Sequence, residues 1–176
     1  MRAYYYKCLF PLFNEYIYMK ADKTVDHHIK AGWHGISRMY NLYAAQFDMT
    51  MAIGYVLLNI DKNGTPATKI APALGLEARS LTRILKSLED KKWIERVADK
   101  DDRRVVNVFL TEYGKKKREE AKQGVLLFNK LVYETIGNEK LETFFEVMKQ
   151  INQIVDTETV NYRNDLTELA ILAEGE

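Results

Sequence analysis

Apolar and aromatic residues recur at helical spacing along most of the chain. The first such run predicts a long helix over residues 24–47, which ends at the polar segment Asp48-Met49-Thr50. A nearly all-apolar run then predicts a shorter, buried helix over residues 51–60. The turn residues at 61–64 end this second helix.

Two short helices separated by a glycine follow. Thr65 is placed to cap the first of them, with Pro66 at the first helical position, and Gly75 supplies a stop that can adopt positive φ. The second helix is predicted over residues 77–91. Its buried face consists of Leu81, Ile84, Leu85 and Leu88. The pair has the shape of a helix-turn-helix.

The hydrophobic period then changes from helical to alternating. Residues 93–98 and 104–111 are rich in β-forming residues and flank a polar segment, which predicts a β-hairpin. Thr111 can cap a long helix over residues 112–136, and Asn138 can cap another. A last, weak helix is expected at about residues 166–172. The predicted fold class is mainly α with one small β-hairpin.

Charge is distributed unevenly although the net charge is only +1. Residues 62–118 contain fifteen Lys and Arg against eight Asp and Glu, a local charge of +7, and the remaining residues together carry −6. A basic middle of this kind favours an anionic partner, although clustering on a solvated surface is the alternative. One cysteine, Cys8, excludes an internal disulfide framework and fits a reducing compartment.

A hairpin directly after a helix-turn-helix is the winged-helix arrangement. The segments "TKIAPALGLEARSLTRILKSLEDKKWIER" and "DKDDRRVVNVFLTEYG", with the helices on both sides, resemble the MarR (multiple antibiotic resistance regulator) family over about residues 24–156. The resemblance implies a DNA-binding transcriptional regulator, most commonly a repressor, that binds a pseudo-palindromic double-stranded operator as a homodimer. It also implies a cytoplasmic protein that is released from DNA by a small aromatic or anionic effector and needs no cofactor.

The same resemblance implies a division of the chain. Residues 24–47 and 112–156 would form a helical dimerisation region, and residues 48–111 the winged helix-turn-helix domain. Residues 157–176 would be a C-terminal tail, and residues 1–23 an N-terminal arm, of which residues 1–18 are either an upstream extension or a loosely attached segment. A secretory signal is not expected, and no apolar run approaches the roughly 20 residues of a membrane span.

The predicted recognition helix turns a basic, hydroxyl-bearing face outward. Arg79 and Arg83 can read guanine edges or hold phosphates, and Ser80 and Thr82 can contact bases or backbone. Lys86 lies on the same face. A solvated helix face is the alternative reading. The start of the preceding helix adds Thr65, Thr68 and Lys69, which can bind a phosphate, act in simple capping, or both.

The wing carries the pattern that the family places at its tip. The resemblance implies that Arg104 enters the minor groove, that Asp102 orients it by pairing with its side chain or with a backbone group, and that Arg103 contacts a phosphate. The loop has Lys100 where the family frequently has proline, and this difference makes the loop more flexible. The basic residues 115–118 can bind phosphate or form a solvated face.

An effector cleft can be formed by side chains of the first long helix, although aromatic residues at helical spacing also build cores. The candidates are Trp33, His34, Arg38, Tyr40 and Tyr43. Redox sensing through Cys8 and metal sensing through His27, His28 and His34 are less favoured variants, the histidines because of their spacing. Enzymatic motifs are lacking. A winged helix that binds protein instead of DNA is the remaining alternative.

Overall fold

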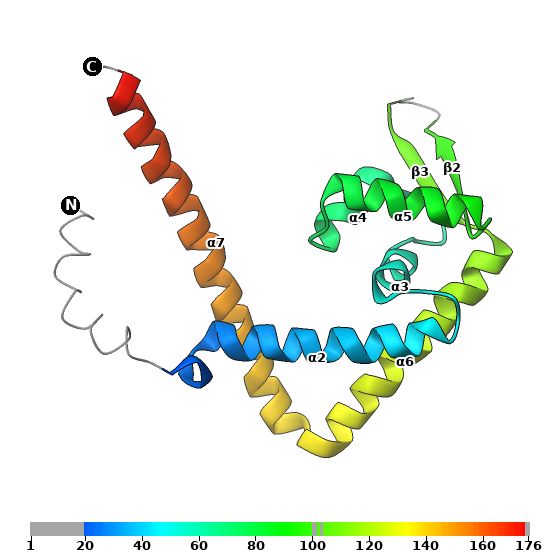
Figure 1. Ribbon diagram of the computed structural model, residues 1–176, viewed down its shortest axis with the longest axis horizontal. Helices are drawn as coiled ribbons and strands as arrows, with labels where there is room; N and C mark the ends of the chain where they lie inside the picture. The colour runs from blue at the N-terminus through cyan, green and yellow to red at the C-terminus, as the bar shows by residue number, and fades with distance from the viewer. Residues whose placement is uncertain (1–19, 100–101, 103, 175–176) are drawn as a thin grey trace. The chain divides into compact units, whose positions relative to one another are not determined.

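A computed structural model describes residues 20–99, 102 and 104–174 of the chain. The chain divides into two compact units, Met1–Gly124 and Val125–Glu176. The described residues are mostly helical with one small sheet, as the sequence predicts (Figure 1). The elements are η1 (Ala21–Lys23), α2 (Val25–Ala45), α3 (Met51–Leu58), β1 (Thr65–Pro66), α4 (Ala67–Ala73), α5 (Ala78–Asp90), β2 (Ile94–Ala98), β3 (Val106–Leu110), α6 (Glu112–Ile136) and α7 (Asn138–Glu174).

The junction between α2 and α3 is fixed by side chains that cap the second helix. The Thr50 hydroxyl accepts a hydrogen bond from the Ile53 N–H at 3.3 Å. The Asn41 side-chain oxygen, one turn before the end of α2, accepts from the Met51 N–H at 3.0 Å. Both bonds satisfy amides that the first turn of a helix leaves unpaired. The predicted break at residues 48–50 is therefore confirmed, and side-chain hydrogen bonds hold the turn between α2 and α3.

The sheet has three antiparallel strands in the order β1-β3-β2. Strands β2 and β3 form the predicted hairpin, in which Ile94 pairs with Leu110 and Ala98 with Val106. The third strand was not predicted: Thr65 pairs with Val108 and Pro66 with Asn107. The expectation that Thr65 caps α4 is therefore wrong. Its hydroxyl instead accepts a hydrogen bond from the Asp61 N–H at 2.8 Å, and the helix begins at Ala67.

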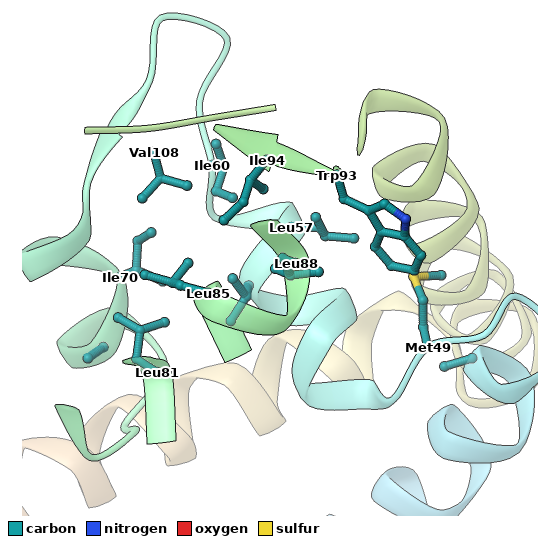
Figure 2. Close-up of a cluster of buried hydrophobic side chains, with 13 residues drawn as sticks. Met49, Leu57, Ile60, Ile70, Leu81, Leu85, Leu88, Trp93, Ile94 and Val108 are labelled. Atoms are coloured by element: carbon teal, nitrogen blue, oxygen red, sulfur yellow. The ribbon is translucent and has the colours of Figure 1, made fainter. Parts of the chain in front are cut away.

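The hydrophobic core of the first unit lies between α3, α4, α5 and the hairpin (Figure 2). Leu57, Leu88 and Val108 are wholly enclosed, and Ile70 and Ile94 are nearly so. The predicted inward face of α5 is confirmed, because Leu81, Leu85 and Leu88 are buried and Ile84 packs against the cluster. Burying one such aliphatic side chain stabilises the fold by about 1.5–3 kcal/mol, so this core holds the helix-turn-helix and the hairpin together.

Two helix ends agree with the sequence, whereas the start and the end of α7 do not. Gly75 has φ +60, and the Thr111 hydroxyl accepts from the Gly114 N–H at 3.0 Å as a cap of α6. Asn138 is the first residue of α7 and not the capping residue before it, so the predicted cap is wrong. The residue before the helix is Gly137, with φ +86. The separate weak helix expected near the C-terminus is wrong, because α7 continues to Glu174. Residues 157–165 are polar but contain no glycine or proline, so nothing interrupts the helix.

The second unit contains the end of α6 and all of α7. Many large apolar side chains of this unit are exposed, both in α6 and in the described part of α7. They are Leu126, Leu127, Leu131, Tyr133, Ile136, Phe144, Phe145, Val147, Ile154, Val155, Val160 and Tyr162. Exposed apolar surface of this extent is typical of protein interaction sites.

Candidate nucleic-acid interface

The outward face of α5 carries the residues that the sequence predicts there. Arg79, Ser80, Thr82, Arg83 and Lys86 are all exposed. The Thr82 hydroxyl donates to the Ala78 carbonyl at 2.9 Å, so its lone pairs stay available to a donor. The burial of the three leucines on the opposite face fixes the direction of these side chains. The helix therefore presents cations and hydroxyl groups to solvent.

The cations on this face are not neutralised by nearby acids. Arg79, Arg83 and Lys86 form no ion pair with any described residue. By contrast, Arg96 of β2 donates from Nε to the Glu89 carboxylate of α5 at 2.9 Å, and a second bond from its Nη2 reaches the same oxygen. This bond lowers the pKa of the Glu89 carboxyl. The bridge ties β2 to α5 and is not evident from the sequence.

The start of α4 contributes only part of the predicted set. Thr68 and Lys69 are exposed beside α5, as a phosphate contact requires. Thr65 is 8% exposed and its hydroxyl is occupied by the Asp61 amide. Thr65 is therefore placed to stabilise the turn before β1, and we leave it out of the proposed interface.

The wing carries Arg104 at its described tip, with the side chain exposed. Of the two partners predicted for Asp102, the structure has the backbone one, because an Asp102 carboxylate oxygen accepts from the Arg104 N–H at 3.0 Å. Arg103 lies outside the described residues. Asp99 was not predicted as a functional residue, but its carboxylate accepts hydrogen bonds from the Asp102 N–H and the Asn107 side chain. In the sequence, the sign of such a role is a carboxylate directly after a predicted strand.

The basic residues at the start of α6 do not form one phosphate site. Lys115 pairs with Glu112 at 2.5 Å. Lys117 is only 7% exposed: its ammonium donates to the Phe47 carbonyl at 3.1 Å and pairs with Glu120 at 2.9 Å. Its Nζ also lies 5.5 Å from the ring centroid of Trp93. For Lys117 the expected phosphate contact is therefore wrong, because its charge is satisfied inside the protein.

Lys117 joins α6 to the turn after α2 and to the base of the hairpin. Burial, the largest single effect, would lower the pKa of its ammonium, but the pairing with Glu120 and the nearby Tyr113 and Asp48 together outweigh it and raise the pKa. The positive charge is thus retained at neutral pH. A buried cation with these partners acts as a structural tie between three segments of the first unit.

Replacing Lys117 by methionine is expected to lower the free energy of unfolding by about 1–3 kcal/mol, because the Phe47 carbonyl loses its partner in a site closed to water. Thermal unfolding followed by circular dichroism should show a fall of about 2–4 °C per kcal/mol. The neighbouring exposed Lys116 provides the matched control, and Lys116→Met should leave the midpoint within about 1–2 °C. Equal midpoints for the two variants would contradict the structural role.

None of the described cavities is lined by all five effector candidates. Trp33 stacks on Tyr55 with ring centroids 6.5 Å apart, and Tyr40 meets the same ring edge-on at 6.2 Å. The Tyr43 hydroxyl donates to the Glu120 carbonyl at 3.3 Å. His34 and Arg38 line one described hollow, together with Ser37, Asn41 and Leu42. Tyr40 and Tyr43 therefore pack within the first unit, as the alternative reading allows, whereas Trp33 contacts Tyr55 but is 51% exposed.

A cavity of about 530 Å³ lies between α4, α5 and the hairpin. Its wall is mostly apolar, with polar groups from Thr68, Thr82 and Arg96. Among the described residues no group of three or more His, Cys, Asp or Glu is placed to hold a metal ion. None of the described helices is long and apolar enough to cross a membrane.

Comparison with known proteins finds relatives that are similar to part of this chain. A sequence model of the MarR family matches residues 55–106. The chain is 32% identical over 95 residues to the HTH-type transcriptional regulator TtmR of Methylorubrum extorquens, covering 53% of this chain and 49% of TtmR. The chain spans about half or less of the length of this relative and of the regulator YpoP of Bacillus subtilis.

Solved structures share the fold over a larger part of the chain. The MepR protein of S. aureus, solved with DNA, has a TM-score of 0.69 at 23% identity and covers 75% of this chain and 98% of its own. The C80S mutant of MarR from E. coli, solved with operator DNA, has a TM-score of 0.65 at 25% identity, covering 72% and 92% of the two chains. The helix-turn-helix, the hairpin and the flanking helices thus form a known architecture.

Proposed function

We propose that this chain is a member of the MarR family of transcriptional regulators and a homodimeric repressor that binds a pseudo-palindromic operator in double-stranded DNA. In this proposal α5 enters the major groove and the β2–β3 wing follows the adjacent minor groove. A small aromatic or anionic effector releases the protein from the operator.

The observation that carries the proposal is the gathering of exposed cations on α5 and the wing. Arg79, Arg83, Lys86 and Arg104 form no ion pair with any described residue, although Glu89 of α5 pairs with Arg96 of β2 and Glu112 pairs with Lys115. Unpaired cations are suited to phosphate oxygens and to the acceptor groups of guanine. A winged helix that binds only protein would not need this arrangement.

The exposed apolar residues of the second unit support a homodimer. Helix α7 is 37 residues long, and the same exposed apolar residues on a second copy of the chain can pack against those of the first. Two copies present two α5 helices, which fit half-sites separated by about 34–36 Å, one turn of B-DNA. The two-fold symmetry of such a dimer predicts a pseudo-palindromic site.

Two of the described cavities are candidate positions for the effector. His34 and Arg38 offer a cation beside the hollow on α2, and the cavity between α4, α5 and the hairpin offers apolar walls with Arg96. The second position touches the recognition helix directly, so an occupant there would alter the spacing between α5 and the wing. A ligand that binds only the altered arrangement releases DNA by shifting the population.

Selection of duplexes from a randomised pool tests the proposal. Repeated binding and amplification should enrich one sequence with two inverted half-sites about one helical turn apart. Sedimentation of the complex on that duplex should give two chains per site. A pool that stays random after several rounds, or one chain per site, would contradict the proposal.

Arg83→Ala is expected to weaken binding to the selected duplex about fivefold, which is about 1 kcal/mol. The effect is moderate because Arg79 and Lys86 stay on the same face. Fluorescence anisotropy on the operator and on variants of each half-site measures it. Relaxed preference at one base pair identifies a guanine contact, and uniform weakening with a smaller salt dependence identifies a phosphate contact.

The exposed Lys130 of α6 provides the matched loss of charge away from α5, and Lys130→Ala should bind the operator like the parent protein. Equal weakening by Arg83→Ala and Lys130→Ala would show that only net charge matters. In that case the assignment of α5 to the major groove would be wrong.

A further inference from the structure

The wing turn is closed by two backbone hydrogen bonds. The Asp99 N–H donates to the Val105 carbonyl at 2.9 Å, and the Val105 N–H donates to the Asp102 carbonyl at 2.9 Å. Residues 99–105 contain neither glycine nor proline, the residues that usually define a tight turn through their own backbone preferences. Side chains must therefore supply much of what holds the described residues of this turn, Asp99, Asp102 and Arg104, in position.

The Asp99 carboxylate is bound at both of its oxygens. Oδ1 accepts from the Asp102 N–H at 3.2 Å, within the turn, and Oδ2 accepts from Nδ2 of Asn107 at 2.8 Å. Asn107 is half-buried in β3, the central strand of the sheet, where it pairs with both β1 and β2. Asp99 thus connects the exposed turn to the most constrained strand of the hairpin.

The chain of hydrogen bonds continues to the arginine at the tip. The Asp102 amide is bound by Asp99, and the Asp102 carboxylate in turn accepts from the Arg104 N–H at 3.0 Å. Three successive side chains, those of Asn107, Asp99 and Asp102, therefore fix the backbone position from which the Arg104 side chain departs. Each of these hydrogen bonds has a normal length, so they form an unbroken series from Asn107 in β3 to the Arg104 backbone.

We propose that Asp99 and Asn107 are a positioning pair that holds the wing turn in the conformation from which Arg104 binds DNA. The inference deepens the proposed function and rests on it. Ordering one residue of a flexible turn costs about 1–2 kcal/mol in conformational entropy. Where hydrogen bonds already hold the Asp102 and Arg104 backbone in the free protein, this cost is not incurred on binding, so preorganisation of these residues raises affinity without an added contact to DNA.

The sign of the expected effect separates this role from simple electrostatics. Asp99 carries a negative charge on an element that approaches phosphates, so by charge alone its removal should tighten binding. A positioning role predicts the opposite, weaker binding in spite of the lost negative charge. The exposed Asp90 of α5 provides the matched control, and Asp90→Ala should leave affinity unchanged or slightly higher.

Binding of the Asp99→Ala and Asn107→Leu variants to the selected duplex tests the pair by fluorescence anisotropy. We expect Asp99→Ala to weaken binding about tenfold and Asn107→Leu about threefold, since leucine removes one donor and no charge. In an Arg104→Ala background, Asp99→Ala should change affinity by less than about twofold, because the pair acts through Arg104. Tighter binding, or an undiminished loss in that background, would overturn the inference.

Amide hydrogen exchange in the free protein gives a readout that needs no DNA. The Asp102 and Arg104 amides should be protected in the parent protein and should exchange faster, by about tenfold, in Asp99→Ala, while core amides of α5 stay unchanged. Unchanged exchange at both amides in Asp99→Ala would overturn the positioning role of Asp99 and Asn107 and leave the proposed function standing. A parent protein that binds no duplex would overturn the proposed function, and with it the consequence for DNA, while leaving the exchange result interpretable.

Discussion

Replacing Arg104 by alanine is expected to weaken binding to the selected duplex by about 10- to 100-fold, within the range of about 1–3 kcal/mol for a base-reading arginine. Arg104 is the exposed cation of the described wing tip, and its backbone is held by Asp102. The narrow minor groove of A·T-rich DNA concentrates negative potential and attracts such a side chain. Fluorescence anisotropy measures the change in affinity.

The loss at Arg104 should be specific to DNA. Sedimentation should show the same oligomeric state as the parent, and thermal unfolding the same midpoint within about 1–2 °C, because the side chain is exposed. The exposed Lys140 of α7 serves as the control for lost charge, and Lys140→Ala should bind normally. Unchanged affinity of Arg104→Ala would remove the wing from the proposed interface.

The largest loss of stability is expected from Gly114→Ala. A Cβ at this position would lie 1.8 Å from the Trp93 carbonyl oxygen, so the first turn of α6 has to move away from the end of the hairpin. That carbonyl is held by bonds from the Thr111 N–H at 3.0 Å and the Thr111 hydroxyl at 3.2 Å, and it cannot shift freely. Contacts of this kind with backbone exceed ordinary overpacking, which costs about 1–3 kcal/mol.

The midpoint of thermal unfolding of Gly114→Ala should therefore fall by about 10 °C or more, at 2–4 °C per kcal/mol. Gly32 is also a helical glycine, but a Cβ there meets no atom within 4 Å. Gly32→Ala should raise the midpoint, since alanine in a helix is favoured over glycine by about 1 kcal/mol. Shifts of the same sign in both variants would contradict the close approach of α6 to Trp93.

The sequence predicted the helix-turn-helix and the hairpin because each depends on local patterns. The spacing of Leu81, Leu85 and Leu88 defines the inward face of α5, and with it the outward face that carries Arg79 and Arg83. The cap at Thr111 and the stop at Gly75 likewise depend on residues close by in the chain. Such features are readable without knowledge of distant partners.

The features that sequence reasoning missed depend on partners distant in the chain. Strand β1 has two residues and exists only through pairing with β3. Lys117 looks like any basic residue of a helix start, and only the arrival of the Phe47 carbonyl, 70 positions away, shows that its charge is internal. The bridge between Glu89 and Arg96 joins two elements whose separate patterns give no sign of it.

Binding of a random-sequence duplex by the parent protein, measured by fluorescence anisotropy at about 50 mM salt and across a salt series, tests the central claim most directly. Phosphate neutralisation dominates at low ionic strength. The exposed cations of α5 and the wing therefore predict binding at about 50 mM salt, with an affinity that falls steeply as salt rises. No binding at that salt concentration, or an affinity independent of salt, would contradict a DNA-binding role for this chain.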